Sequence, residues 1–421
     1  MHKKTVLDNG LKVVTHNMPA RQSAALGIWI KAGGRYESSE FKGISHFLEH
    51  LLFKGSIHYS CRQIKESVEG VGGALNGFTS EELTCYLVKI PADSLVAALD
   101  ILADMVNNPL ILSEDVEKER TVILEEIKMY KDLPQSYVHE LLDELLWPNH
   151  PLGMSIAGSL ESVRRIQRND LYSYKTNYYN ASNIVVSAAG NLEHAKLVAE
   201  IEKRFDKRIK EKPATYLPPF SSQKKPQAKL MYKDTEQTHI ALGFTALKRE
   251  HPLRYALMLL HIILGANMSS RLFNEIREKR GLAYEIGTQL KRFQDTGAFV
   301  VHAGMDNNKV QDCLVLILKE LGKITQKNVL SDEFSRAKKF MLGQLMLSLE
   351  DTMDNMLWIG ESESMLKRIY TLADIIKQVA KTKVENLKEV GRLIFKEENI
   401  NLALIGPVKD EDKLIQLLEL R

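Results

Sequence analysis

Two histidines and a glutamate stand together in one short segment of the 421-residue chain. His46 and His50 flank Glu49 in the pattern His-x-x-Glu-His, within a stretch whose apolar residues recur at helical spacing. Because residues four apart share a helix face, both imidazoles point to one side and the apolar stripe to the other. Two neutral imidazoles one turn apart suit zinc, and a neighbouring carboxylate suits a general base. The alternative is a surface helix that carries two histidines by chance.

A zinc site of this inverted His-x-x-Glu-His kind needs a third protein ligand from another element. Residues 113–130 are predicted to form a helix with acidic residues in its first turn, where the helix dipole favours them. Glu119 and Glu126 are seven apart, so they lie on the same face. Helix geometry alone does not choose among Glu119, Glu125 and Glu126, and acidic residues commonly form a solvated face.

The surrounding chain alternates strand and helix patterns. An Asn9-Gly10 pair between β-forming residues predicts a hairpin over 5–14. Further strands are predicted at 24–31, 82–90 and 183–189. Helices are predicted at 44–53, 62–71, 94–106, 113–130 and 136–146.

The chain divides into two similar halves. Four prolines between 209 and 227 predict a stiff linker, which gives domains 1–208 and 228–421. Ala25-Leu26-Gly27 recurs as Ala241-Leu242-Gly243, and Asn183-Ile184 recurs as Asn399-Ile400, each 216 positions later. Two matches at one offset indicate duplication, against the alternative of two unrelated α/β domains.

Composition excludes several classes of protein. The chain is 44% hydrophobic and 26% charged, with a net charge of +3, which is typical of a globular protein without a nucleic-acid or anionic-membrane partner. Three scattered cysteines are too few for a disulfide framework. The longest apolar stretch, Tyr255–Ala266, is too short to span a bilayer. No targeting segment is recognised, so the chain is expected to be cytoplasmic or already processed.

Several segments together resemble one family. Gly43–Gly55, which contains the paired histidines, is followed by Glu117-Lys118-Glu119-Arg120 and then by Glu125-Glu126-Ile127. The chain resembles the pitrilysin/insulinase family of zinc metallopeptidases, most closely the mitochondrial processing-peptidase β-subunit and its bacterial relatives. The resemblance implies that Glu126 is the third zinc ligand, with Glu119 assisting the site and Glu49 acting as the base.

Two further segments extend the resemblance. Asn76, Gly77, Phe78 and Thr79 match the edge strand on which the family lays its substrate as an added β-strand, although the family usually has Ala in place of Gly77. In the second half, the matching positions imply that Arg277 and Tyr284 hold the substrate carbonyl and stabilise the oxyanion. Ile262 and Ala266 stand 216 positions after the histidines, which implies one Zn²⁺ per chain.

The resemblance implies an α/β (α+β) fold with two homologous halves. Each half is expected to be a mixed, antiparallel-rich sheet with helices on one face, and the halves are expected to face each other across a cavity. The implied function is a zinc endopeptidase acting on extended peptides or presequence-like segments. Since one chain carries both the zinc motif and the Arg/Tyr pair, a homodimer is expected. The alternatives are a non-catalytic scaffold of the same fold and a catalytic subunit that needs a different partner chain.

Overall fold

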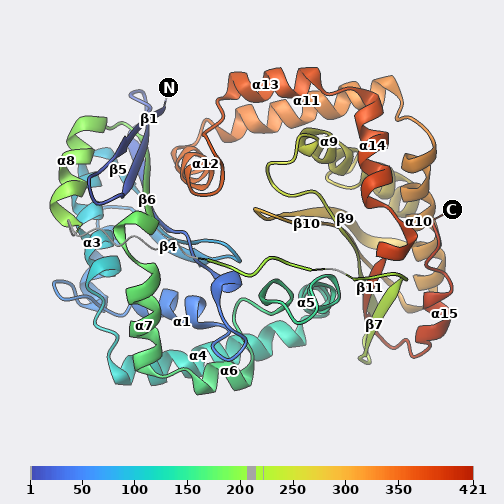
Figure 1. Cartoon of the computed structure of the whole chain (residues 1–421), viewed down its shortest axis with the longest axis horizontal. Coiled ribbons are helices and arrows are strands. Elements are labelled where there is room, and N and C mark those ends of the chain that lie inside the picture. The colour runs from blue at the N-terminus through green and yellow to red at the C-terminus, as the bar shows by residue number, and fades with distance from the viewer. Residues whose placement is uncertain (1, 206–214, 221, 421) are drawn as a thin grey trace. The chain divides into compact units, whose positions relative to one another are not determined.

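Two compact units, each built around one β-sheet, make up the chain (Figure 1). The computed structural model describes residues 2–205, 215–220 and 222–420, so residues 209–214 and 221 of the predicted linker lie outside the described residues. The first unit comprises Met1–Ile127, Met154–Leu217 and Leu345–Thr371; the second comprises Lys128–Gly153, Pro218–Gln344 and Leu372–Arg421. Each unit therefore includes one segment from the other half of the sequence.

Six strands form the sheet of the first unit, in the spatial order β1-β2-β6-β3-β5-β4. Their bounds are β1 His2–Val6, β2 Lys12–Asn17, β3 Ser23–Ile30, β4 Ala74–Thr79, β5 Thr84–Pro91 and β6 Ile184–Gly190. All neighbours are antiparallel except β2 and β6. The predicted hairpin is confirmed, since β1 pairs with β2 and Gly10 takes the left-handed φ of +84° that glycine adopts freely. Within the described residues β4 pairs with β5 alone and is an edge strand.

Five strands form the sheet of the second unit, in the order β7-β11-β8-β10-β9. Their bounds are β7 Gln227–Tyr232, β8 Gln237–Thr245, β9 Ala283–Arg292, β10 Gly297–Asp306 and β11 Asn401–Gly406. This sheet also has one parallel pair, β7 with β11. β8 and β11 occupy the places that β3 and β6 occupy in the first sheet, and these are the strands linked by the 216-residue offset. The two halves therefore share one topology, as the repeat predicts.

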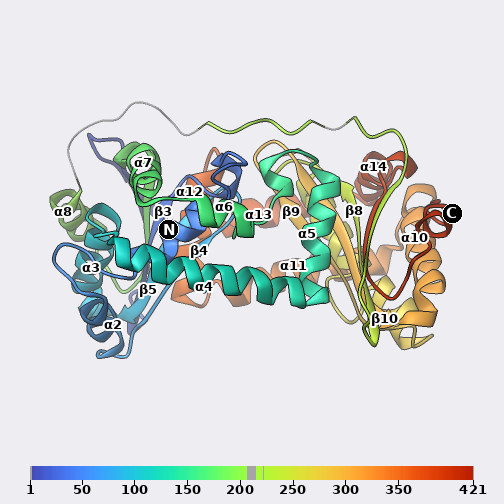
Figure 2. The same cartoon turned by 90° about the horizontal axis from the view of Figure 1, so that it is seen from below.

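Helices of the first half cover one face of the first sheet. They are α1 Ile44–Leu52, α2 Cys61–Glu69, α3 Leu95–Asn107, α4 Ser113–Asp132, α6 Leu160–Arg165, α7 Arg168–Tyr178 and α8 His194–Arg204. Alternate residues of β3 point to opposite faces, so Leu26 and Ile28 join the core beneath these helices while Ala25 and Trp29 lie on the other side. α4 is one continuous helix, along which the chain passes from the first unit into the second (Figure 2).

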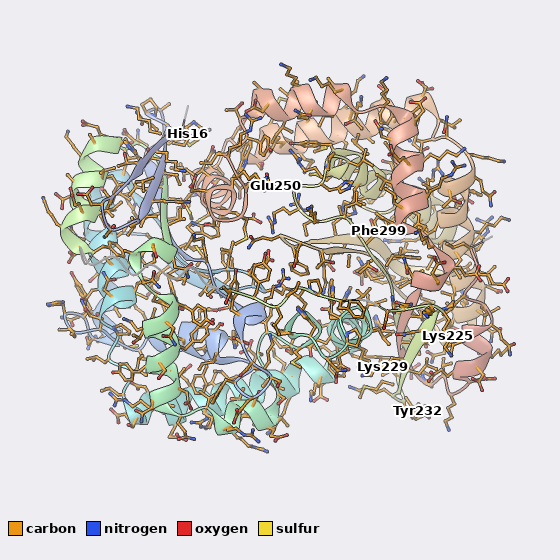
Figure 3. The ribbon with its side chains drawn as sticks, in the orientation of Figure 1. His16, Lys225, Lys229, Tyr232, Glu250 and Phe299 are labelled. Atoms are coloured by element: carbon orange, nitrogen blue, oxygen red, sulfur yellow. The ribbon has the colours of Figure 1, made fainter. Side chains whose placement is uncertain are left out.

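Helices of the second half cover one face of the second sheet in the same way. They are α9 Arg254–Leu264, a π-helical turn at Phe273–Glu278, α10 Val310–Gln326, α11 Ser331–Ser348, α13 Leu372–Lys381, α14 Val384–Ile394 and α15 Glu411–Ile415. Phe299 of β10, labelled in Figure 3, is fully buried in this core and packs edge-on against Phe395 at a centroid distance of 5.2 Å. α9 contains most of the longest apolar stretch, and no helix of the described ranges is long and apolar enough to cross a membrane.

Within the described residues, the opposite face of each sheet is covered by one helix from the other half of the sequence. α12 (Thr352–Met365) packs against β6, β3 and β2 of the first unit. Here Asn355 Oδ1 lies 2.8 Å from Nδ1 of His16, a residue that Figure 3 labels. α5 (Pro134–Leu146) packs against β8 and β11 of the second unit, where Asp143 pairs with Lys291. Each sheet thus has the expected helices on one face and one exchanged helix on the other.

Candidate metal centre

α1 carries the paired histidines and is fixed at both its apolar face and its N-terminus. Phe47, Leu48 and Leu51 are fully buried, whereas His46 and His50 lie on the half-buried opposite side, as the sequence predicts. The backbone N–H groups of Gly43 and Ser45 donate to the Glu37 carboxylate at 2.9 and 2.7 Å, which satisfies donors that a helix N-terminus otherwise leaves free.

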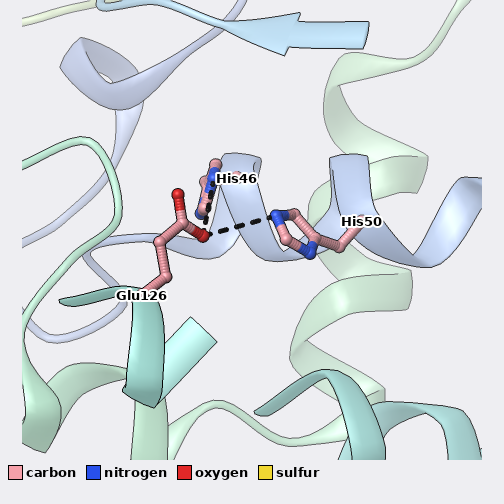
Figure 4. Close-up of side chains that lie close together, drawn as sticks. All are labelled: His46, His50 and Glu126. Carbon is pink, nitrogen blue, oxygen red and sulfur yellow. Dashed lines mark ion pairs between the residues drawn. The ribbon is translucent and has the colours of Figure 1, made fainter. Parts of the chain in front are cut away.

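The carboxylate of Glu126, in α4, lies close to both histidine side chains. Its Oε2 lies 3.8 Å from Nε2 of His46 and 3.7 Å from Nε2 of His50, so that three potential ligand atoms converge (Figure 4). Tetrahedral zinc ligands lie about 3.4 Å apart, and the two separations from Glu126 exceed this distance by only a few tenths of an ångström. The structure thereby distinguishes Glu126 from Glu125, which is exposed on the same helix. Two imidazole nitrogens and a carboxylate oxygen are one of the sets of three protein ligands that catalytic zinc takes.

Glu119 lies behind the histidines rather than among the converging atoms. Its Oε2 is 3.0 Å from Nδ1 of His50, the ring nitrogen that faces away from Glu126. A carboxylate in this position orients an imidazole and selects its tautomer. No other group of three His, Cys, Asp or Glu side chains in the described part of the chain converges like His46, His50 and Glu126.

Electrostatics at this site favour neutral His46. Burial, and to a smaller extent the neighbouring His50, lowers the pKa of His46 to about 4. An imidazole that is neutral near pH 7 keeps a lone pair for a metal. Burial raises the pKa of Glu49, whereas a hydrogen bond from Thr79 opposes that rise. A raised pKa brings a carboxyl closer to the range in which it can accept and return a proton.

The edge strand β4 contributes to the setting of Glu49. Thr79 Oγ1 donates to Oε2 of Glu49 at 2.6 Å, so the last residue of the strand holds one carboxylate oxygen. A Cβ added at Gly77 would lie 3.0 Å from the ring of Phe53 and 3.3 Å from Oε1 of Glu49, which places Gly77 on the same side.

The other two predicted edge residues are oriented differently. Asn76 Oδ1 accepts the backbone N–H of Gly77, and Phe78 packs edge-on against Trp29 at 5.8 Å. The contact of Thr79 with Glu49 is not predicted from the sequence, although strand alternation places Thr79 on the same face as Gly77.

Arg277 and Tyr284 form a pair of their own in the second unit. Arg277 lies in the π-helical turn, a form that often occurs at functional sites, and its guanidinium carbon is 5.5 Å from the centre of the Tyr284 ring. Tyr284 is the second residue of β9 and is 75% exposed. Gly281, between them, takes φ +57°, which allows the tight turn from helix to strand. The structure therefore brings together this predicted pair, seven residues apart in sequence.

Comparisons with known proteins agree with this fold, and the names of several relatives agree with a zinc site. Residues 12–160 match the family model "Insulinase (Peptidase family M16)", and residues 165–341 match "Peptidase M16 inactive domain". An uncharacterized zinc protease of Bacillus subtilis is 37% identical over 97% of this chain and 98% of its own, and one of Streptomyces coelicolor is 35% identical over 97% and 90%. The crystal structure of a Helicobacter pylori protease has a TM-score of 0.90 at 23% identity, covering 97% of this chain and 99% of its own.

These matches are to proteins of the insulinase family, several of which are named zinc proteases. The chain belongs to the insulinase family, peptidase family M16. The match of 165–341 to a domain described as inactive accords with the second half, where Ile262 and Ala266 stand in place of the paired histidines.

Proposed function

We propose that this chain is a zinc endopeptidase that hydrolyses extended peptides, with one Zn²⁺ per chain. The observation that carries the proposal is the convergence of His46, His50 and Glu126 from two helices, with Glu49 beside them. Membership of the insulinase family and the names of the relatives support the broader assignment of a zinc protease.

In this proposal different side chains of the protein bind the metal and transfer the proton. His46, His50 and Glu126 hold the zinc ion. When bound there, zinc supplies a Lewis acid that polarises the scissile carbonyl and makes water more acidic. Glu49 accepts a proton from the attacking water at Oε1, since Oε2 is held by Thr79, and returns it to the leaving amide nitrogen.

Substrate recognition is assigned to two places. The free edge of β4 offers backbone donors and acceptors over Asn76–Thr79, which suits an added strand from an extended peptide and makes few demands on its sequence. Arg277 and Tyr284 are proposed to hold the substrate carbonyl and to donate hydrogen bonds to its oxygen as negative charge develops. Because one chain supplies all these groups, we infer that its working form is a homodimer rather than an obligate pair of different chains.

Replacing Glu49 by Gln separates metal binding from chemistry. The amide keeps the shape of the side chain but cannot accept the proton, so the variant should bind about one zinc per chain and lose turnover of a quenched, unstructured peptide. The wild type should bind zinc and turn the peptide over. Undiminished hydrolysis by Glu49→Gln would overturn the assignment of the base.

The alternative function is a scaffold. One similar structure is a chain of complex III2 from Candida albicans, with a TM-score of 0.85 at 21% identity over 99% of both chains. In the present chain the three converging ligand groups and the neighbouring carboxylate are all present, which favours catalysis. Zinc bound by the purified wild type together with no peptide turnover would favour the scaffold, or a catalytic subunit that needs another chain.

A further inference from the structure

Lys54 lies close to the candidate metal centre without belonging to the His-x-x-Glu-His pattern. It directly follows Phe53, the C-cap of α1, and is four residues beyond His50. Its ammonium lies 2.6 Å from Oε1 of Glu119, while Oε2 of the same carboxylate lies 3.0 Å from Nδ1 of His50. Each oxygen of Glu119 therefore has its own partner, and the three side chains form a continuous series.

Charge and burial make Lys54 important to Glu119. The Glu119 side chain is only 7% exposed, and a buried carboxylate is costly unless it is paired. The adjacent cation, Arg120, instead directs its guanidinium to Glu117 and to the carbonyl oxygens of Val163 and Ile166. Among the described residues, Lys54 is the lysine or arginine that forms an ion pair with Glu119.

Glu119 in turn decides how His50 is presented. An ionised carboxylate only accepts hydrogen bonds, so Nδ1 of His50 carries the proton and Nε2, which faces Glu126, keeps its lone pair. His46 lacks this support, because its Nδ1 is buried without a hydrogen-bond partner in the described structure. Of the two imidazoles, His50 is the one whose orientation depends on a carboxylate.

We propose that Lys54 is a positioning residue that fixes Glu119, and through it the orientation of His50 toward the metal. The inference rests on the proposed function, because it requires zinc to bind to His46, His50 and Glu126. It assigns Lys54 no contact with substrate or metal.

Removing Lys54 has two opposing consequences. Loss of a positive charge near the site favours binding of a cation, whereas loss of the grip on Glu119 lets the carboxylate rotate away from His50. The orientation effect is expected to dominate, because Glu119 lies between the ammonium and the imidazole and already compensates the lysine charge. Disturbing such outer partners of a metal ligand typically weakens metal affinity by about 10- to 100-fold.

The test is zinc affinity, measured on the metal-depleted full chain by competition with a chromophoric chelator. Lys54→Met should bind zinc about tenfold more weakly, near the lower limit of that range because Lys54 acts through another residue. Lys54→Arg should restore affinity to within about threefold of the wild type, because arginine also pairs with a carboxylate. The matched control is Lys118→Met, since Lys118 is the neighbour of Glu119 on α4 but faces Glu114 and Asp115. The control should bind zinc as the wild type does.

A double-mutant cycle with Glu119→Gln keeps the test decisive if Lys54→Met also lowers the thermal stability of the metal-free protein. If Lys54 acts through Glu119, adding Lys54→Met to Glu119→Gln should cost little further affinity. Unchanged or tighter zinc binding by Lys54→Met would overturn the proposal, as would fully additive losses in the cycle. Failure of the wild type itself to bind zinc would instead refute the proposed function.

Discussion

Replacing Gly360 by alanine should destabilise the first unit, although alanine is the better helix former. Gly360 lies inside α12, where the helix crosses the sheet face that carries Trp29. A Cβ at this position would lie 2.1 Å from Nε1 of Trp29 and 2.6 Å from Oγ of Ser187. Neither neighbour can yield easily, because the indole N–H donates to that hydroxyl at 2.7 Å and both side chains are buried.

The expected change in the free energy of unfolding is the sum of two contributions. Gly→Ala inside a helix contributes about 0.5–1 kcal/mol of stability, whereas overpacking a tight interior typically costs about 1–3 kcal/mol. The clash at Gly360 involves a hydrogen-bonded pair rather than the free end of a flexible chain, so we expect net destabilisation of about 1–2 kcal/mol. Gly343→Ala is the matched control, because Gly343 lies inside α11 and a Cβ there would meet nothing within 4 Å.

Urea unfolding of the metal-free protein distinguishes the two variants. Gly360→Ala should lower the transition midpoint, and Gly343→Ala should leave it unchanged or raise it. If Gly360→Ala were as stable as the control, the close packing of α12 on Trp29 would be refuted.

Two further predictions concern Thr79 and His139. Thr79→Val removes the hydrogen bond to Glu49 and should lower kcat/KM by about 10- to 100-fold at unchanged zinc affinity, since a hydrogen bond to a charged group contributes about 1.5–3 kcal/mol. The control variant Thr79→Ser should retain activity. A valine variant as active as the wild type would refute the claim that Thr79 positions Glu49. Burial, with smaller contributions from His302 and Lys291, lowers the pKa of His139 to about 4, so the unfolded chain binds a proton that the folded chain excludes between about pH 6.5 and 4. The free energy of unfolding should therefore fall as pH falls through this range, by up to about 3 kcal/mol from this group. His139→Gln should make this fall shallower when urea unfolding is measured at a series of pH values. An unaltered dependence of the unfolding free energy on pH would contradict the prediction.

Local patterns in the sequence predict the elements that carry the candidate centre. The apolar stripe of α1 and the seven-residue spacing of Glu119 and Glu126 depend on one helical period, which neighbouring residues specify. Helical spacing alone does not select Glu126 as the converging acid, because the selection depends on how α4 crosses α1. The hydrogen bond from Thr79 to Glu49 and the ion pair of Lys54 with Glu119 join residues that are 30 and 65 positions apart. Contacts over such separations leave no periodic pattern in the sequence.

The exchanged helices could not be predicted from the sequence for a related reason. α5 was expected as a helix, but its partner strands β8 and β11 lie about 100 and 260 residues further along the chain. Amphipathic periodicity indicates that a helix buries one face, and it does not indicate which sheet receives that face. The division of the chain at residues 209–227 stays a prediction, and the exchange of α5 and α12 shows that one cut there would separate each of these helices from the sheet it covers.

The most direct test of the account is the zinc stoichiometry of the metal-depleted chain after reconstitution, compared for the wild type, Glu126→Gln and Glu125→Gln. The two glutamates are adjacent on α4, but only Glu126 converges with His46 and His50. The account predicts about one tightly bound zinc per chain in the wild type and in Glu125→Gln, and loss of tight binding in Glu126→Gln. Zinc retained by Glu126→Gln at wild-type affinity, or absent from the wild type, would contradict it.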